Sequence, residues 1–128
     1  MSLKVLVIDD DTDYTEMMRL RLESWGHTPT IVHNWLSAMM KTSRESFDLM
    51  LIDIETPTGN GLTACKDLCN DPKIAATPKV FITGRSDDDS IQRCYELNAK
   101  YIHKSSGVFD ELLTVMTDLQ QSKSKVTS

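Results

Sequence analysis

No apolar stretch of this sequence is long enough for a membrane-spanning helix. Such a helix takes about 20 consecutive apolar residues, and in this chain of 128 residues polar or charged side chains interrupt every apolar run well before that length. The segment 1–8 is also too short, and too soon followed by acids, for a signal peptide. We therefore expect a cytoplasmic protein without membrane contact.

Cysteine is scarce, and basic residues are fewer than acidic ones. The three cysteines, Cys65, Cys69 and Cys94, form no pair of CxxC motifs, which is typical of reduced thiols. Cys65 and Cys69 lie four residues apart and could share a metal, but buried thiols are the simpler interpretation. The net charge of −5 repels phosphates, so we expect no nucleic-acid partner.

The chain has the length of a single domain, and its 40% of hydrophobic residues suffice for one core. We assign residues 1–121 to this domain and expect the polar segment 122–128 to be a frayed tail. Too little chain follows the last helical pattern for a second domain. Any action on other molecules is therefore expected to pass through a separate protein or through dimerisation.

Five short strand patterns alternate with helical patterns along the chain. Strands are predicted at 3–8, 28–32, 49–52, 79–82 and 101–102, and the apolar runs at 3–8 and 49–52 indicate buried ones. This alternation predicts a parallel sheet with helices on both faces. The expected fold class is α/β, a flavodoxin-like (βα)5 doubly wound parallel sheet with strand order 2-1-3-4-5.

The pattern also predicts where helices begin and which side faces the sheet. Asp11 or Thr12 caps the first helix, Gly26 ends it, and Asn34 caps the second. Apolar residues at helical spacing mark the inner faces. These residues are Tyr14, Met17, Met18, Leu22 and Trp25, then Trp35, Ala38 and Met39, then Leu62, Cys65, Leu68 and Cys69, then Ile91, Cys94 and Tyr95, and finally Phe109, Leu112, Leu113, Met116 and Leu119.

Polar residues stand where four of these strands end. Asp9 and Asp10 follow the first strand, Asp53 the third, Thr83 the fourth and Lys104 the fifth. The carboxyl ends of parallel strands meet at one edge, where open α/β sheets bind ligands, so we expect these side chains to converge. An acid that merely ends a strand would explain one of them, but not the whole set.

Three clustered carboxylates repel one another unless a cation lies between them. Mg²⁺ prefers oxygen ligands and needs only a few carboxylates, so Asp9, Asp10 and Asp53 predict a magnesium site. For Asp11, an exposed acid that caps the first helix is the better interpretation.

The remaining strand-end residues fit phosphoryl transfer, which requires mainly positioning and charge neutralisation. Lys104 supplies positive charge and Thr83 a hydroxyl donor, while Asp53 can be the attacking carboxylate. Strand alternation should point His103 away from the site, so we expect no competing nucleophile there.

With these strand-end residues, the chain resembles the receiver domain of two-component response regulators over nearly its whole length. The resemblance implies a stand-alone signalling switch rather than an enzyme that turns over a substrate. The matching segments are 7–11, 53–57 with Gly61, 83–84 and 101–104.

The resemblance also implies roles for the acids. Asp53 would accept a phosphoryl group from a sensor histidine kinase or a histidine phosphotransfer protein. Asp9, Asp10 and Asp53 would bind Mg²⁺ together with the backbone carbonyl of Glu55.

Further roles implied by the resemblance concern the switch itself. Thr83 and Lys104 would contact the phosphoryl group, and Tyr101 would turn inward when the threonine moves. The surface of the fourth helix, fifth strand and fifth helix would then change for a partner, in a monomer or a phosphorylation-dependent dimer. Gln92, Arg93, Glu96 and Tyr101 would lie on or near that surface.

Two residues depart from the family pattern. Ser105 follows Lys104 where the family has a proline in a cis peptide. A non-proline cis bond costs about 3 kcal/mol, so this bond is either trans or a strained cis bond. Gly84 replaces a common alanine and loosens its loop. An inactive pseudo-receiver that only docks is therefore an alternative.

Glu55 and Arg85 each lie two residues beyond a key position. We hypothesise that they pair across the mouth of the site and hinder hydrolytic water, which would tune the lifetime of the phosphoryl group. Two unrelated surface charges are the competing interpretation.

Two other classes share some of these features. A haloacid-dehalogenase-type phosphatase also uses a strand-end aspartate, but its motif has a second aspartate where Glu55 stands. A flavin-binding electron carrier shares the fold, but Asp9, Asp10 and Asp11 would repel the flavin phosphate.

Overall fold

The computed structural model describes residues 2–53, 55–56, 59–60, 66, 70–84, 88–97, 99–105 and 107–127. Its main sheet has five parallel strands. Counted along the chain within this sheet, their order is 2-1-3-4-5, which confirms the predicted fold class. From one edge to the other they are β2 (Thr28–Val32), β1 (Lys4–Ile8), β3 (Leu49–Ile52), β6 (Lys79–Thr83) and β7 (Lys100–His103).

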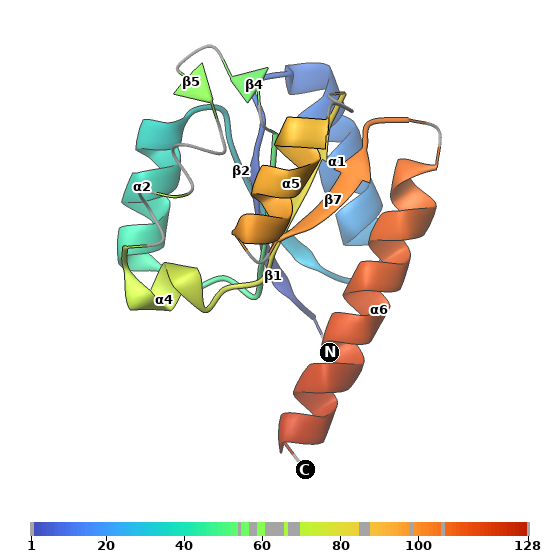
Figure 1. The fold of residues 1–128 in the computed structure, drawn as a ribbon. Helices are drawn as coiled ribbons and strands as arrows, with labels where there is room; N and C mark the ends of the chain where they lie inside the picture. Colours follow the sequence, from blue (N-terminus) through green and yellow to red (C-terminus); the bar gives the residue numbers. More distant parts are fainter. Residues whose placement is uncertain are drawn as a thin grey trace.

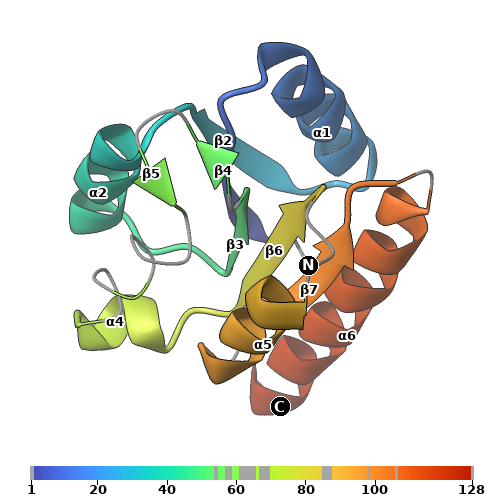
Figure 2. The same ribbon diagram turned by 45° about the horizontal axis from the view of Figure 1, so that its top comes forward.

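Helices cover both faces of the sheet (Figures 1 and 2). On one face lie α1 (Thr12–Ser24) and α6 (Val108–Thr127). On the other lie α2 (Trp35–Arg44), α4 (Pro72–Ala75) and α5 (Asp88–Glu96).

Two segments between β3 and β6 need separate mention. The short helix α4 forms in a segment for which we predicted neither a helix nor a strand. Of the predicted third helix, only Lys66 is described, and it is helical. Its four predicted inner-face residues, Leu62, Cys65, Leu68 and Cys69, lie outside the described residues.

β3 is apolar at every position, and β1 is apolar from Val5 to Ile8, because both faces of these strands are buried. In β1, Leu6 and Ile8 belong to the core beneath α2 and α5, whereas Val5 and Val7 belong to the core beneath α1 and α6. Successive side chains of a strand point to opposite faces. An uninterrupted apolar run is therefore the pattern of a strand covered on both sides.

Helix caps fix how the chain leaves the strands. The Asp11 carboxylate accepts the Tyr14 N–H at 3.0 Å, so Asp11 rather than Thr12 caps α1. The Asn34 side chain accepts the Ser37 N–H at 2.8 Å and caps α2, as predicted. Each such cap stabilises its helix by about 1 kcal/mol. Gly26, at a φ of 88°, lies just beyond α1, where a left-handed residue ends a helix.

Four apolar residues that we assigned to inner helix faces are exposed instead. Two threonines, Thr15 and Thr42, are buried although no apolar pattern predicted them. Each hydroxyl donates to a carbonyl oxygen three or four residues earlier in its own helix, so its burial leaves no donor unsatisfied. The exposed residues are Met17, Met39, Tyr95 and Leu113.

The end of the chain also differs from the expectation. The segment that we expected to be frayed continues α6 through Thr127, and the helix extends past the lower end of the sheet in Figure 1. Within the described residues, no helix combines the length and the apolar content that crossing a bilayer requires.

Candidate functional site

The strand pairing places two acids side by side at the carboxyl edge of the sheet, at the top of Figure 1. β1 pairs with β3 in a register that aligns Ile8 with Ile52. The Asp53 N–H donates to the Ile8 carbonyl at 3.0 Å, and the Asp9 N–H donates to the Val32 carbonyl at 3.2 Å. These bonds extend the sheet by one residue. The backbones of Asp9 and Asp53 are therefore held by the same hydrogen-bond ladder that joins the buried strands.

Three carboxylates meet at this edge and fit the oxygen-donor set of Mg²⁺. Asp9, Asp10 and Asp53 each offer an oxygen, and the three oxygens lie within 4.8 Å of one another. Asp9 and Asp53 are almost fully buried, whereas Asp10 is exposed. Few protein oxygens and an open side suit an ion that retains several waters. Asp11 is engaged in capping α1, as expected.

Lys104 reaches this cluster from the end of β7. Its ammonium lies 2.9 Å from Asp9 Oδ2 and 3.7 Å from Asp53 Oδ2. Burial by itself lowers the pKa of Lys104, but the hydrogen bond to Asp9 and the charges of Asp53, Asp9 and Asp11 outweigh it, so the pKa lies above its usual value. The side chain is therefore a fixed positive charge beside Asp53 at neutral pH.

The backbone around Lys104 shows whether the Lys104–Ser105 peptide bond is cis or trans. The Lys104 N–H donates to the Thr83 carbonyl at 2.7 Å, which joins the ends of β6 and β7. No peptide bond among the described residues is cis, so the Lys104–Ser105 bond is trans. Lys104 thus reaches the acids without a cis bond.

Thr83 and Tyr101 occupy the positions expected of them in the sheet. Thr83 is the last residue of β6 and is buried, at the same edge as Asp53. Tyr101, in β7, is half-buried and packs against the core beneath α2 and α5. On α5, Gln92 and Glu96 are exposed and Arg93 is half-buried.

The predicted tuning pair is only partly described. The backbone of Glu55 forms β4 (Glu55–Thr56), which pairs with β5 (Gly59–Asn60) in a small hairpin. The Glu55 side chain and all of Arg85 lie outside the described residues. The metal contact of the Glu55 carbonyl and the pairing with Arg85 therefore stay predictions.

Tyr14 belongs to the site although the sequence indicated only a core residue. The Lys104 ammonium lies 4.2 Å from the centre of the Tyr14 ring. The ring lines a small cavity together with Asp9 and Asp53. Burial, with added repulsion from Asp9, Asp53 and Asp11, raises the pKa of Tyr14 far above its usual value. Its position three residues after the capping Asp11 was the available signal, since that places it in the first helical turn.

Two histidines lie near this edge and have different roles. His33 Nδ1 lies 2.9 Å from the Asp9 carbonyl oxygen, so the ring donates to the turn that carries the acids. His33 follows β2, the neighbour of β1, and the strand order could have revealed this contact. His103 Nε2 instead lies 3.2 Å from the Gly84 carbonyl oxygen, which agrees with the prediction that it points elsewhere.

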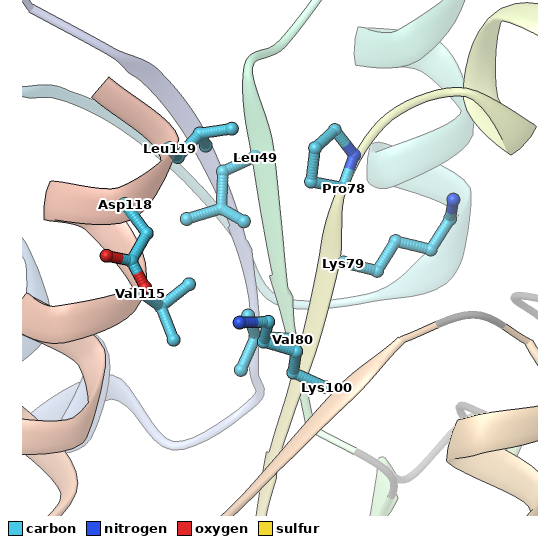
Figure 3. Close-up of a pocket in the computed structure, with 8 residues that line it drawn as sticks. All are labelled: Leu49, Pro78, Lys79, Val80, Lys100, Val115, Asp118 and Leu119. Atoms are coloured by element: carbon cyan, nitrogen blue, oxygen red, sulfur yellow. The ribbon is translucent and has the colours of Figure 1, made fainter. Parts of the chain in front are cut away.

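A cavity of about 250 Å³ lies at the opposite end of the sheet, between α6 and the starts of β3, β6 and β7 (Figure 3). Its described walls are mainly aliphatic, and Asp118 is the one acid among the lining residues that the structure describes. It is therefore not part of the candidate site. The lining residues are Leu49, Pro78, Lys79, Val80, Lys100, Val115, Asp118 and Leu119.

Comparison with known proteins adds independent findings. The family model described as "Response regulator receiver domain" matches residues 5–117. The transcriptional regulatory protein CrdR of Helicobacter pylori is 31% identical over 112 residues, which are 88% of this chain and 52% of CrdR. The chain thus spans about half the length of this curated relative.

Solved structures agree with the fold. A two-component response regulator from Clostridium difficile superposes with a TM-score of 0.85 at 24% identity, covering 94% of this chain and 97% of the other. The response regulator TrrA from Thermotoga maritima, solved in complex with Mg²⁺ and BeF, has a TM-score of 0.78 at 26% identity. That match covers 93% of this chain and 99% of TrrA.

Proposed function

Because this chain belongs to the response regulator receiver domain family, whose members are phosphorylatable aspartate switches, we propose that Asp53 is its phosphoryl acceptor. The observation that carries the proposal is the position of the Lys104 ammonium, 3.7 Å from Asp53 Oδ2 and 2.9 Å from Asp9 Oδ2. A buried carboxylate beside a fixed cation and two further acids is the arrangement that phosphoryl transfer requires.

The chemistry follows from these side chains. A carboxylate oxygen of Asp53 forms a bond to phosphorus while the bond from phosphorus to the donor breaks, and the leaving group takes the bonding electrons. Lys104 is placed to neutralise charge on the transferred group, and the Thr83 hydroxyl to donate to it. Mg²⁺, held by Asp9, Asp10, Asp53 and the Glu55 carbonyl, would supply further charge neutralisation. The Mg²⁺–BeF complex of TrrA, in which BeF mimics a phosphoryl group, supports this requirement.

The proposed output passes from the site to the surface of α5, β7 and α6. Phosphorylation draws Thr83 toward Asp53, Tyr101 turns into the space, and the surface around Gln92, Arg93 and Glu96 changes. The surface thus has two conformations, and the charge added by the phosphoryl group shifts the equilibrium between them. The phosphoryl donor is a sensor histidine kinase or a histidine phosphotransfer protein, and a separate output protein reads the changed surface in the cytoplasm.

Family membership favours this function over the alternatives considered above. We propose that the domain catalyses only its own phosphorylation and dephosphorylation. It would act as a monomer or as a phosphorylation-dependent dimer, without binding nucleic acid itself.

The test is phosphorylation by acetyl phosphate with Mg²⁺, read by intact-protein mass spectrometry. We expect the wild type to gain one phosphoryl group, Asp53→Asn to gain none, and chelation of Mg²⁺ to prevent the gain. Asp118→Asn, an exposed aspartate at the opposite end of the molecule, is the matched control. An unmodified wild type, or equal labelling of Asp53→Asn, would refute the proposal.

A further inference from the structure

We propose that Tyr14 is a positioning residue for Lys104: its aromatic ring holds the ammonium beside Asp53. The inference rests on the proposed function, because it assigns Tyr14 a part in the phosphorylation of Asp53. It concerns a residue outside the acidic motif and outside the strand ends.

The contacts of Lys104 show what the ring adds. The ammonium lies 4.2 Å from the centre of the Tyr14 ring, 2.9 Å from Asp9 Oδ2 and 3.7 Å from Asp53 Oδ2. A cation this close to a ring centre is attracted by the negative face of the π system. The Lys104 side chain is only 23% exposed, so water screens this attraction less than at an open surface.

The ring is held in place by the same turn that carries the acids. The Tyr14 N–H donates to the capping carboxylate of Asp11, so Tyr14 lies in the first turn of α1. One turn further along the helix, Met18 is fully buried in the core beneath α1 and α6. The ring therefore rests on a rigid element, unlike the exposed Ser105 that follows Lys104.

A neutral ring does something that the carboxylates cannot do. Asp9 and Asp53 are both partners of Lys104 and candidate ligands of a cation, so these two uses compete for the same carboxylates. The ring face attracts the ammonium but is no ligand for a hard divalent ion. It can thus hold Lys104 near Asp53 whatever the carboxylates bind.

The hydroxyl of Tyr14 is not the functional part. It is buried and has no hydrogen-bond partner among the described residues. Burial also raises the pKa of Tyr14, so the hydroxyl stays protonated and offers no charge to Lys104. The attraction of the Lys104 ammonium therefore comes from the ring face, which phenylalanine retains and leucine lacks.

The first experiment compares rates of phosphorylation by acetyl phosphate at saturating Mg²⁺. We expect Tyr14→Leu to react about 3- to 30-fold more slowly than the wild type, the range of a cation–π contact. Tyr14→Phe should recover most of this loss. Phe109→Leu, which removes a ring 4.7 Å from the guanidinium of Arg21 on the surface of α1 and α6, is the matched control and should react at the wild-type rate.

The second experiment observes Lys104 directly, without metal or phosphate. In competitive labelling with trace acetic anhydride, Lys104 should become more reactive in Tyr14→Leu than in the wild type, relative to the exposed Lys41 of the same sample. A double-mutant cycle completes the test. In a Lys104→Met background, Tyr14→Leu should cause no further loss of rate, because the two residues act as one unit.

The outcomes separate the two proposals. If the wild type is phosphorylated on Asp53 but Tyr14→Leu matches it in rate and in Lys104 labelling, the role of Tyr14 is refuted and the proposed function stands. Additive losses in the double mutant would also refute that role. A wild type that is never phosphorylated would refute the proposed function and, with it, this role.

Discussion

Lys104 and Lys79 lie at opposite ends of the sheet, and both bring an ammonium group into largely buried surroundings. Lys79, at the start of β6, is 4% exposed and donates to the carbonyl oxygens of Ile74 and Thr77 at 2.6 and 2.8 Å. Lys104, beyond the end of β7, is bound by carboxylates and a ring. The partners of Lys79 are backbone carbonyls at and just after α4, whereas the proposed function requires a phosphoryl group to replace partners of Lys104.

The two ends of the sheet differ in how their polar groups are paired. At the amino ends of the strands, Lys79 and His27 are paired with backbone groups of the structure. At the carboxyl ends, acids of like charge gather, and the hydroxyl of Tyr14 lacks a partner among the described residues. Such groups lower the stability of the fold unless a partner or a bound ligand compensates them, so the two ends should respond differently to substitution.

The largest expected effect is on reactivity at the carboxyl end. Lys104→Met should slow phosphorylation of Asp53 by about 100-fold or more, since removing one preorganised group that stabilises developing charge has effects of this size. The measurement is the rate of labelling by acetyl phosphate with Mg²⁺. A rate close to that of the wild type would show that Lys104, like Lys79, has no part in the reaction.

At the amino end, the same substitution should affect stability instead. Lys79→Met leaves the carbonyl oxygens of Ile74 and Thr77 without their buried donor, which should lower the free energy of unfolding by about 1–3 kcal/mol. Urea denaturation measures this change. The phosphorylation rate of the folded variant should stay that of the wild type, and a large loss of rate would contradict the comparison.

A smaller effect of opposite sign is expected at Tyr14. Tyr14→Phe removes a buried hydroxyl without a partner among the described residues, so the free energy of unfolding should rise by about 1 kcal/mol. Urea denaturation without metal is the measurement. A loss of stability would mean that the hydroxyl has a favourable contact and that the carboxyl end is less strained than the comparison holds.

The smallest expected effect concerns His27, at the amino end. Its Nδ1 accepts the Leu3 N–H at 3.1 Å, so the folded protein needs a neutral ring, and burial lowers the pKa of His27 below its usual value. As the pH falls below about 6.5, the unfolded chain takes up a proton before the folded one does. Stability is therefore complete above this pH and decreases below it, with a slope of at most about 1.4 kcal/mol per pH unit for one proton.

Unfolding free energies between pH 7.5 and 5.5 test this point. His27→Gln should flatten the acid side of the profile. His103→Gln, at the exposed carboxyl edge, is the control and should leave the slope unchanged. An identical slope in His27→Gln and the wild type would rule out His27 as the source.

Much of the site could be predicted because it follows from strand order alone. Asp9, Asp53, Thr83 and Lys104 each end or follow a strand, and a parallel sheet brings all such residues to one edge. The residues that were missed lie beside the strands or depend on packing. The contact of Tyr14 with Lys104 could be predicted only if the rotation of α1 about its axis were known. Met39 and Tyr95 were assigned to inner helix faces because helical spacing is compatible with more than one face.

From the sequence alone we could predict the strand order, the two covered faces of the sheet and the edge at which the acids gather. These properties follow from apolar runs and turn residues, which act locally. The groups that contact Lys104 depend on how the folded chain packs: they are a carboxylate at 2.9 Å, a second at 3.7 Å and the ring of Tyr14. The contact between Tyr14 and Lys104 depends on how α1 packs over the sheet, and no local pattern encodes that geometry.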